Sequence, residues 1–238
     1  MPCQLARRAE VVPRIFRSAV SGRPLGRAFL ATLAASSAPL AILGLAVALF
    51  LSPAWVDFEQ ARSNVAGLTG FSRAEVREVT GSILSDLVLG PPSFDALVDG
   101  RPVLDAAERS HMVDVRRSLL FFAGLTTTAS LALVAVLAAN RRERWAWRAA
   151  ATGSAALGVA TAVVALGTLV FFDPLFRVFH LVVFPQGNFE FDPRTQRLVQ
   201  LFPERFWSET ALALGAVVLV LAATSSYLLA RRARRLQG

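Results

Sequence analysis

Charge is missing from four long stretches of this sequence, and its absence decides the fold class. Each uncharged run has at least the roughly 20 residues that a helix needs to cross about 30 Å of hydrocarbon, and in lipid only a helix satisfies its own backbone. Hydrophobic residues make up 54% of the 238, which excludes an ordinary soluble domain. We therefore predict an all-α membrane protein with four transmembrane helices, at about residues 28–52, 118–139, 149–172 and 210–230.

Cysteine and histidine are nearly absent, which narrows the chemistry. The single cysteine, Cys3, excludes an internal disulfide, and with no cysteine or histidine near it we assign it no role. The only histidines are His111 and His180. No HExxH motif is present, and two histidines with scattered acids make a weak ligand set, so we expect neither a metal nor a cofactor. Because none of the four spans contains an ionisable residue, the pattern also argues against transport.

Lysine is absent too, so arginine supplies all of the positive side-chain charge, and the arginines are unevenly distributed along the sequence. The segments before the first span, between spans two and three, and after the last span hold 14 arginines and 2 acidic residues, a net charge of +12, whereas the rest of the chain carries −4. The positive-inside rule places the first set in the cytoplasm, with basic tails at 1–27 and 231–238. The outward segments, 57–117 and 173–209, then form a helical cap. Arginines that flank spans indicate topology and lipid contact, so we expect no nucleic-acid partner.

The arginines before the first span do not make it a secretion signal. About 27 residues precede this span, its apolar core is far longer than the roughly 7 to 15 residues of a signal peptide, and no clear cleavage site follows. We expect the span to remain as a membrane anchor, within a membrane domain that covers residues 28–230.

The first outward segment carries two helix signals. In the first helix Ser72 stands three residues before Glu75, the spacing of a capping box, and a proline pair ends the helix. Its apolar residues fall on one stripe, formed by Phe71, Val76, Val79, Ile83 and Leu87. The second helix starts near Asp105, with Glu108 again three residues later. We expect it to carry His111 and to run into the second span.

The second outward segment opens on Asp173-Pro174, a capping acid followed by proline at the first helical position. The apolar stretch that follows is about three turns long, too short to cross, so we expect an interfacial or re-entrant helix that carries His180. After a turn at the sequence QGN, Asp192-Pro193 repeats the start signal. The helix expected there aligns four apolar residues along one side, Leu198, Leu201, Phe202 and Phe206.

The two histidine-containing segments carry specific motifs. The pattern positions are His111, Met112, Asp114 and Val115 in the first segment and Phe179, His180, Phe184, Phe191, Asp192, Leu201, Pro203, Glu204 and Phe206 in the second. With these motifs set on four spans, almost the whole chain resembles the bacterial integral membrane protein family that includes the lipoprotein intramolecular transacylase.

The resemblance implies an activity, partners and a location. The family's transacylase moves an acyl chain from the glycerol sn-2 position of a diacylglyceryl-cysteine lipoprotein to the free amine of the same cysteine, and the two implicated histidines fall on His111 and His180. The resemblance also implies a multi-pass protein of the bacterial cytoplasmic membrane with its active face outward. Its partners would be diacylglyceryl-modified lipoproteins and membrane lipids. The oligomeric state stays open.

Aminolysis of an ester fits the residues themselves. The α-ammonium must lose a proton, the oxyanion must be stabilised and the glycerol alkoxide must be protonated as it leaves. Imidazole, with an ordinary pKa near 6.5, can carry out either proton transfer. Glu108 and Asp114 lie three residues to either side of His111, so one of these carboxylates could hold its tautomer. The candidates for the oxyanion are Arg109, Arg116, Arg177 and Arg205.

Each of these residues also has a structural explanation. A histidine at a membrane interface is commonly a polar group satisfied at the water line, the acids near His111 fit a solvated helix face, and the arginines fit headgroup contacts. The phenylalanines of the second outward segment fit packing and interfacial anchoring first and acyl-chain binding second, and these are Phe176, Phe179, Phe184 and Phe206. The alternative function is therefore a non-catalytic lipid- or lipoprotein-binding accessory protein. Convergence of the two imidazoles discriminates between the alternatives.

Overall fold

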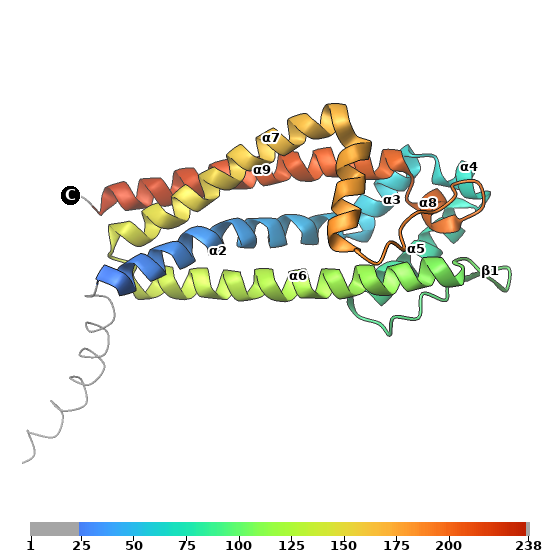
Figure 1. Cartoon of the computed structure of the whole chain (residues 1–238), viewed down its shortest axis with the longest axis horizontal. Coiled ribbons are helices and arrows are strands. Elements are labelled where there is room, and N and C mark those ends of the chain that lie inside the picture. Colours follow the sequence, from blue (N-terminus) through green and yellow to red (C-terminus); the bar gives the residue numbers. More distant parts are fainter. Residues whose placement is uncertain (1–23, 237–238) are drawn as a thin grey trace, which may run out of the picture.

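Four long helices form an elongated bundle with a small cap at one end (Figure 1). The computed structural model describes residues 24–236, so Cys3 and most of the basic N-terminal tail lie outside the described residues. Each long helix is long and apolar enough to cross a membrane, which confirms the predicted all-α membrane fold with four spans. These helices are α2 (Pro24–Phe50), α6 (Ala106–Ala139), α7 (Arg144–Val183) and α9 (Glu204–Arg235). Both ends of the described chain lie opposite the cap, while the cytoplasmic assignment of that end stays a prediction.

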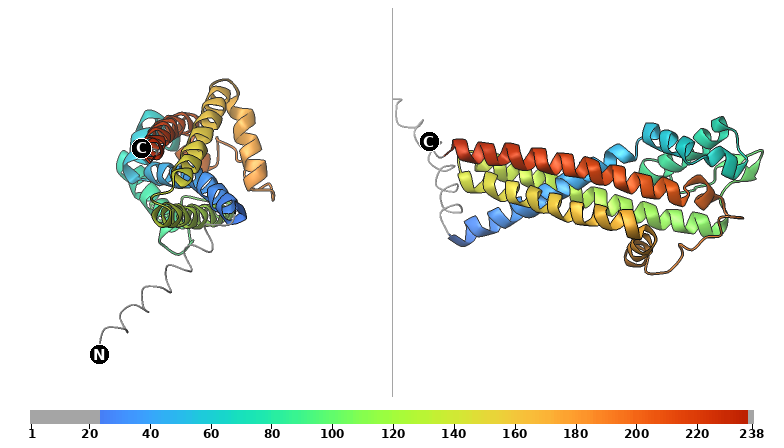
Figure 2. Two further views of the ribbon diagram at one scale, coloured as in Figure 1. Left: turned by 90° about the vertical axis from the view of Figure 1, so that its left-hand side faces the viewer. Right: turned by 90° about the horizontal axis from the view of Figure 1, so that it is seen from above.

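Small side chains let the long helices approach closely. α2 packs against the other three, and α7 lies along α9 (Figure 2). Where α2 meets α7, a Cβ added to Gly153 would stand 1.9 Å from the backbone oxygen of Ala35, so no larger residue fits there without a shift of the helices. Close backbone approach strengthens van der Waals packing, which holds helices together in lipid, where no hydrophobic effect drives their association. The buried alanines beside this contact are Ala34, Ala38, Ala146 and Ala150.

The cap is built from short elements at one end of the bundle. They are α3 (Pro53–Arg62), α4 (Val65–Thr69), α5 (Arg73–Val88), a hairpin of β1 (Leu97–Val98) and β2 (Arg101–Pro102), and α8 (Arg197–Leu201). The predicted apolar stripe of α5 packs in its core against Phe94, Leu104 and Leu201. The capping boxes predicted at Ser72 and Asp105 are both present. From the second box α6 runs unbroken into the predicted second span, as expected.

The hairpin is a departure from the helical pattern of the cap. β1 and β2 pair antiparallel, and the two turn residues, Asp99 and Gly100, both have positive φ, 50° and 74°. Asp-Gly favours a two-residue hairpin turn because both positions tolerate this backbone. The signal was thus present in the sequence, although we predicted only helices for this outward segment.

α7 bends sharply where the third predicted span ends. Phe171 has a non-helical backbone (φ −127°, ψ 40°), and the leg after it, residues 172–183, turns across the bundle (Figure 1). Pro174 explains the break, because proline lacks an N–H and its ring clashes with the carbonyl group four residues earlier, at Val170. The predicted separate helix is therefore present, although the break lies at Phe171 rather than at Asp173.

No helix starts at Asp192, so that prediction is wrong. The carbonyl oxygen of Asp192 instead closes a turn, in which it accepts from the amides of Thr195 and Gln196. α8 begins only at Arg197 and lasts five residues, because Pro203 ends it and caps the start of α9. The predicted stripe is therefore divided between two helices, although most of it is buried, as Leu198, Leu201 and Phe206 show.

Candidate active site

The two histidines converge at the cap end of the bundle. His111 lies in the second turn of α6, and His180 lies on the leg of α7 that follows the bend. Their rings are nearly parallel, with an interplanar angle of 22° and ring centroids 6.3 Å apart. Imidazoles at this spacing can reach one reacting centre directly or through a water. The expected convergence is confirmed.

One ring nitrogen of His180 is hydrogen-bonded to the backbone, and the other can exchange a proton with a substrate. Its Nδ1 lies 2.8 Å from the carbonyl oxygen of Phe176, one turn earlier on the same leg. A carbonyl oxygen only accepts hydrogen bonds, so Nδ1 carries the proton of the neutral ring and Nε2 holds the lone pair. Nε2 is therefore the atom of His180 that can take up a proton.

Aromatic rings surround both imidazoles. Phe184 contacts His111 and His180 at once, with ring centroids 4.9 Å and 5.6 Å away. Such an apolar surrounding disfavours a charged imidazole and suits an acyl chain. The other rings packed on the pair, at centroid distances from 4.1 to 5.5 Å, are Phe176, Phe179, Phe189 and Phe191.

Three of the four phenylalanines predicted to bind acyl chains lie at this site, and the fourth does not. Phe206 is buried against the rings of Phe202 and Trp207. The site instead includes Phe189 and Phe191, which we did not predict as binding residues. Their signal was the alternation of aromatic residues just after the QGN turn, which brings both rings to one side of an extended chain.

Glu108 does not hold the His111 ring as expected. It is buried, and its two oxygens accept from backbone amides, Oε1 from Leu198 at 2.6 Å and Oε2 from Asp105 at 2.7 Å. A buried carboxylate needs such partners, and these bonds tie the start of α6 to α8. Glu108 therefore fixes the position of the helix that carries His111.

Asp114 fastens the loop 184–191 to α6. Its Oδ2 accepts from Gln186 Nε2 and from Asn188 Nδ2, each at 2.8 Å, and its Oδ1 pairs with Arg117 at 3.1 Å. The loop carries the rings that wall the histidines, so Asp114 holds that wall in place. We predicted neither amide as a site residue, although the QGN turn places two side-chain amides between aromatic residues.

Burial makes His111 a neutral imidazole near neutral pH. The residue lies two turns before the first residue of the second span, Ser118. Desolvation lowers its pKa below the usual 6.5, the nearby His180 lowers it further, and the side chains of Asn188 and Asp114 partly counteract this. His111 Nδ1 is buried and has no hydrogen-bond partner within residues 24–236. A neutral ring of this kind can accept a proton.

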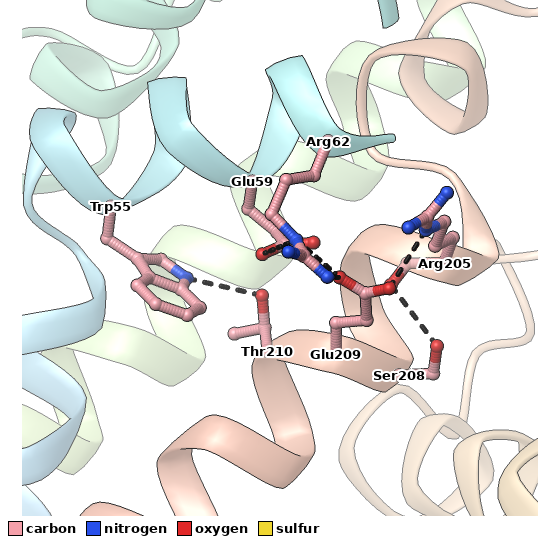
Figure 3. Close-up of polar contacts among 7 residues, drawn as sticks. All are labelled: Trp55, Glu59, Arg62, Arg205, Ser208, Glu209 and Thr210. Carbon is pink, nitrogen blue, oxygen red and sulfur yellow. Dashed lines mark hydrogen bonds and ion pairs between the residues drawn. The ribbon is translucent and has the colours of Figure 1, made fainter. Parts of the chain in front are cut away.

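Two of the predicted oxyanion arginines are engaged elsewhere in the cap. Arg116 donates to the carbonyl oxygen of Asp86, at the end of α5. Arg205 pairs with Glu209 at 2.8 Å in a separate cluster of charged side chains between α3 and α9 (Figure 3). Neither guanidinium group is therefore oriented on the histidine pair.

The other two arginines lie closer to the elements of the site. At the start of α6, the hydrogen bond from the Glu108 amide lowers the pKa of Asp105 below its usual range, and the charge of the nearby Arg109 lowers it further. Arg177 lies on the same leg as His180 and pairs with Glu190 of the loop at 3.5 Å, with both side chains exposed. The charged side chains do not gather into a metal site, since the described part of the chain has no group of three or more His, Cys, Asp or Glu that could hold one.

The fold matches solved structures of a bacterial membrane protein. The membrane integral lipoprotein intramolecular transacylase Lit from Bacillus cereus gives a TM-score of 0.73 at 19% sequence identity, over 90% of this chain and 97% of that chain. Two variants of the same protein, each with one histidine replaced, give a TM-score of 0.67 at 18% identity, over 88% of this chain and 92% and 94% of theirs. At this identity the likeness shows the fold. No curated protein sequence matches the chain.

The family follows from the sequence rather than from the fold. The family model of the lipoprotein intramolecular transacylase Lit matches residues 32–207, which is most of the chain and includes both histidines. The match covers most of α2, all of α6 and α7, and the start of α9. The chain therefore belongs to the lipoprotein intramolecular transacylase family of membrane acyltransferases.

Proposed function

We propose that this chain moves the sn-2 acyl chain of a diacylglyceryl-cysteine lipoprotein to the α-amine of the same cysteine, at the outer leaflet of the bacterial cytoplasmic membrane. The observation that carries the proposal is the convergence of His111 and His180, the only two imidazoles in the sequence. Family membership supports the class of reaction. The charge asymmetry supports an outward active face, with the cap outside and the basic tails in the cytoplasm.

The two histidines supply the proton transfers. One imidazole takes the proton that the cysteine amine loses as its nitrogen attacks the sn-2 ester carbonyl and forms the new C–N bond. When the C–O bond to glycerol breaks, an imidazolium gives a proton to the departing glycerol oxygen. Once the α-ammonium has lost its first proton to solvent, transfer from the neutral amine neither consumes nor releases a net proton, electron or water, which suits two neutral imidazoles with apolar walls. General acid and base catalysis of this kind contributes ~10²- to 10⁴-fold.

Positioning of the lipid supplies the rest of the catalysis. Donor and acceptor belong to one molecule, so the enzyme mainly has to hold them in an attack geometry. Phe179 contacts His180 and is 55% exposed, and Leu181 and Val182 on the same leg are exposed as well. An acyl chain lying along this leg would bring its ester to the imidazoles. Arg177, also on the leg and exposed, could meet the oxyanion or a lipid phosphate.

Mass spectrometry of lipoprotein N-terminal peptides tests the proposal. Bacterial cells that lack amine-acylated lipoproteins should acquire them when they express this chain, and the glycerol should lose its sn-2 acyl chain at the same time. Cells that express the His111→Ala variant at equal membrane levels should not. No acyl transfer to any tested lipoprotein would favour the non-catalytic lipid- or lipoprotein-binding alternative.

A further inference from the structure

Two side-chain amides of the loop 184–191 bind the same carboxylate oxygen, but their surroundings differ. Gln186 and Asn188 each donate to Asp114 Oδ2 at 2.8 Å. Gln186 is exposed to solvent, whereas Asn188 is half-buried and its Oδ1 is fully buried. The bond from Gln186 can only fasten the loop. The bond from Asn188 also fixes a second polar atom, inside the site.

Asp114 decides which way the Asn188 amide points. A carboxylate oxygen only accepts, so the amide nitrogen must face Asp114 and Oδ1 must face away from it. Within residues 24–236 this buried Oδ1 has no hydrogen-bond partner, and neither has the buried Nδ1 of His111. Buried polar atoms without partners are rare and costly. Asn188 bonds to Asp114, one turn after His111 on α6, and the His111 ring packs on Phe184 and Phe191, which lie on either side of Asn188 in the loop, so the amide and the ring are neighbours.

We propose that Asn188 is a positioning residue for His111, in which Asp114 holds the amide nitrogen and Oδ1 accepts the Nδ1–H of the ring as the two atoms close on each other. An amide oxygen cannot donate, so the neutral ring keeps its proton on Nδ1 and presents the lone pair of Nε2. His180 reaches the same state through the carbonyl oxygen of Phe176. Both imidazoles then offer Nε2 to one reacting centre. Only the catalytic consequence rests on the proposed function, because the tautomer itself does not depend on it.

The two histidines of the chain make the tautomers measurable by nuclear magnetic resonance. Full-length protein labelled with nitrogen-15 at histidine and held in lipid nanodiscs gives two imidazole spectra, which a His180→Gln protein assigns. We expect the Nδ1–H tautomer for both rings of the unmodified protein. Asn188→Leu keeps the side-chain volume but removes the acceptor, so it should release His111 to a mixture of tautomers and leave His180 unchanged.

Acyl transfer on a reporter lipoprotein gives the second readout. Asn188→Leu should lower the rate by roughly tenfold, because one hydrogen bond sets the tautomer. The acid limb of the pH–rate profile should move to lower pH, since the variant loses a group that raises the pKa of His111. Gln186→Met is the matched control. It removes the other donor to the same Asp114 oxygen, so the tautomer of His111 should stay as in the unmodified protein, and the rate should fall by less than in Asn188→Leu.

The outcomes separate this proposal from the function that it extends. An Nε2–H tautomer of His111 in the unmodified protein overturns the positioning role and needs no variant to be seen. The same tautomer with and without Asn188, or equal losses in Asn188→Leu and Gln186→Met, overturns it as well, because the amides would then only fasten the loop. An Asn188-dependent tautomer in a protein that transfers no acyl chain would support the positioning role and contradict the proposed function.

Discussion

Two clusters of ionisable side chains lie at the cap end of the bundle, and they are built in opposite ways. His111 and His180 have aromatic rings as neighbours and no counter-charge bonded to either ring among the described residues. The second cluster joins α3 to α9 (Figure 3) and consists of Glu59, Arg62, Arg205 and Glu209. Each cluster has one buried atom without a hydrogen-bond partner within residues 24–236, Nδ1 of His111 and Oε1 of Glu59.

Charge pairing dominates the second cluster. Hydrogen bonds from Arg205, Glu59 and Arg62 lower the pKa of Glu209 to about 2. Burial and, after it, the neighbouring Glu209 together raise the pKa of Glu59 to about 7, against the opposing charges of Arg62 and Arg205. Glu59 is thus a protonated acid beside a carboxylate over most of the acidic range, and the two arginines are already paired. Together with the bond from Trp55 Nε1 to Thr210 Oγ1 at 3.2 Å, the cluster ties α3 to α9 (Figure 3).

The candidate site is not the place where most charged side chains gather. The carboxylate cluster pairs its arginines within itself and joins two helices. Within residues 24–236 no carboxylate is bonded to either imidazole, and burial keeps His111 neutral and able to move a proton despite the nearby charge of Asp114. The surrounding rings suit an acyl chain. The proposed roles are therefore chemistry for the histidines and structure for the carboxylates, and the following variants test that division.

The largest effect is expected from either histidine. His111→Ala or His180→Ala should lower acyl transfer to the amine by ~10²- to 10⁴-fold, because each removes a proton carrier. The double variant should be little worse than the worse single variant, since residues that act as a unit are non-additive. Mass spectrometry of a reporter lipoprotein measures the transfer, with membrane levels as the control. Full activity in a well-expressed His180→Ala protein would contradict the two-histidine mechanism.

Glu209→Ala should affect stability and leave the chemistry intact. It removes the carboxylate that Arg62 and Arg205 share, after which Arg62 keeps only the longer contact with Glu59 at 3.7 Å. Because both arginine side chains are half exposed, solvent screening limits the loss to about 1 kcal/mol. Thermal unfolding in detergent measures the loss. Acyl transfer per folded molecule should match that of the unmodified protein, and a selective loss of transfer at unchanged stability would show that the carboxylate cluster takes part in the reaction.

Glu59→Gln should remove a pH dependence of stability. The pKa of Glu59 is about 7 in the folded protein against an ordinary 4.5, so the folded state binds more protons between these values. The stability that Glu59 contributes is present below pH 4.5 and is lost as the pH rises through 7. The melting temperature of the unmodified protein should therefore fall between pH 5 and pH 7.5, and that of Glu59→Gln should fall less. Parallel curves would mean that Glu59 is ionised throughout.

Asp114→Asn should lower acyl transfer far less than the loss of either histidine. One amide oxygen can still accept from Gln186 and Asn188, so only the extra strength of a charged acceptor is lost, ~1 kcal/mol. We expect acyl transfer in Asp114→Asn to fall by less than about tenfold. In Asp114→Ala, which lacks the acceptor, acyl transfer should fall further. Equal losses in the two variants would show that the histidine site needs the negative charge itself, as the carboxylate cluster does.

Local patterns in the sequence determined most of the architecture. The four uncharged runs decided the spans, because lipid admits only helices of sufficient length. The capping boxes at Ser72 and Asp105 and the stripe of α5 were readable because their partners lie three or four residues apart. Where two local signals competed, the outcome was harder to read. At Asp192 a turn formed instead of a helix start, and near Asp173 the clash of Pro174 moved the break to Phe171.

The hydrogen-bond partners of the site's carboxylates follow from contacts between residues far apart in the sequence. Glu108 bonds to the amide of Leu198, 90 residues away, and Asp114 bonds to Asn188, 74 residues away, so neither carboxylate was free for the ring that its spacing suggested. The bend of α7 decided that His180 faces His111. Helical periodicity identifies only neighbours one turn apart on the same helix. A buried carboxylate instead bonds to whichever donor the tertiary packing places beside it, because an unpaired buried charge is energetically costly.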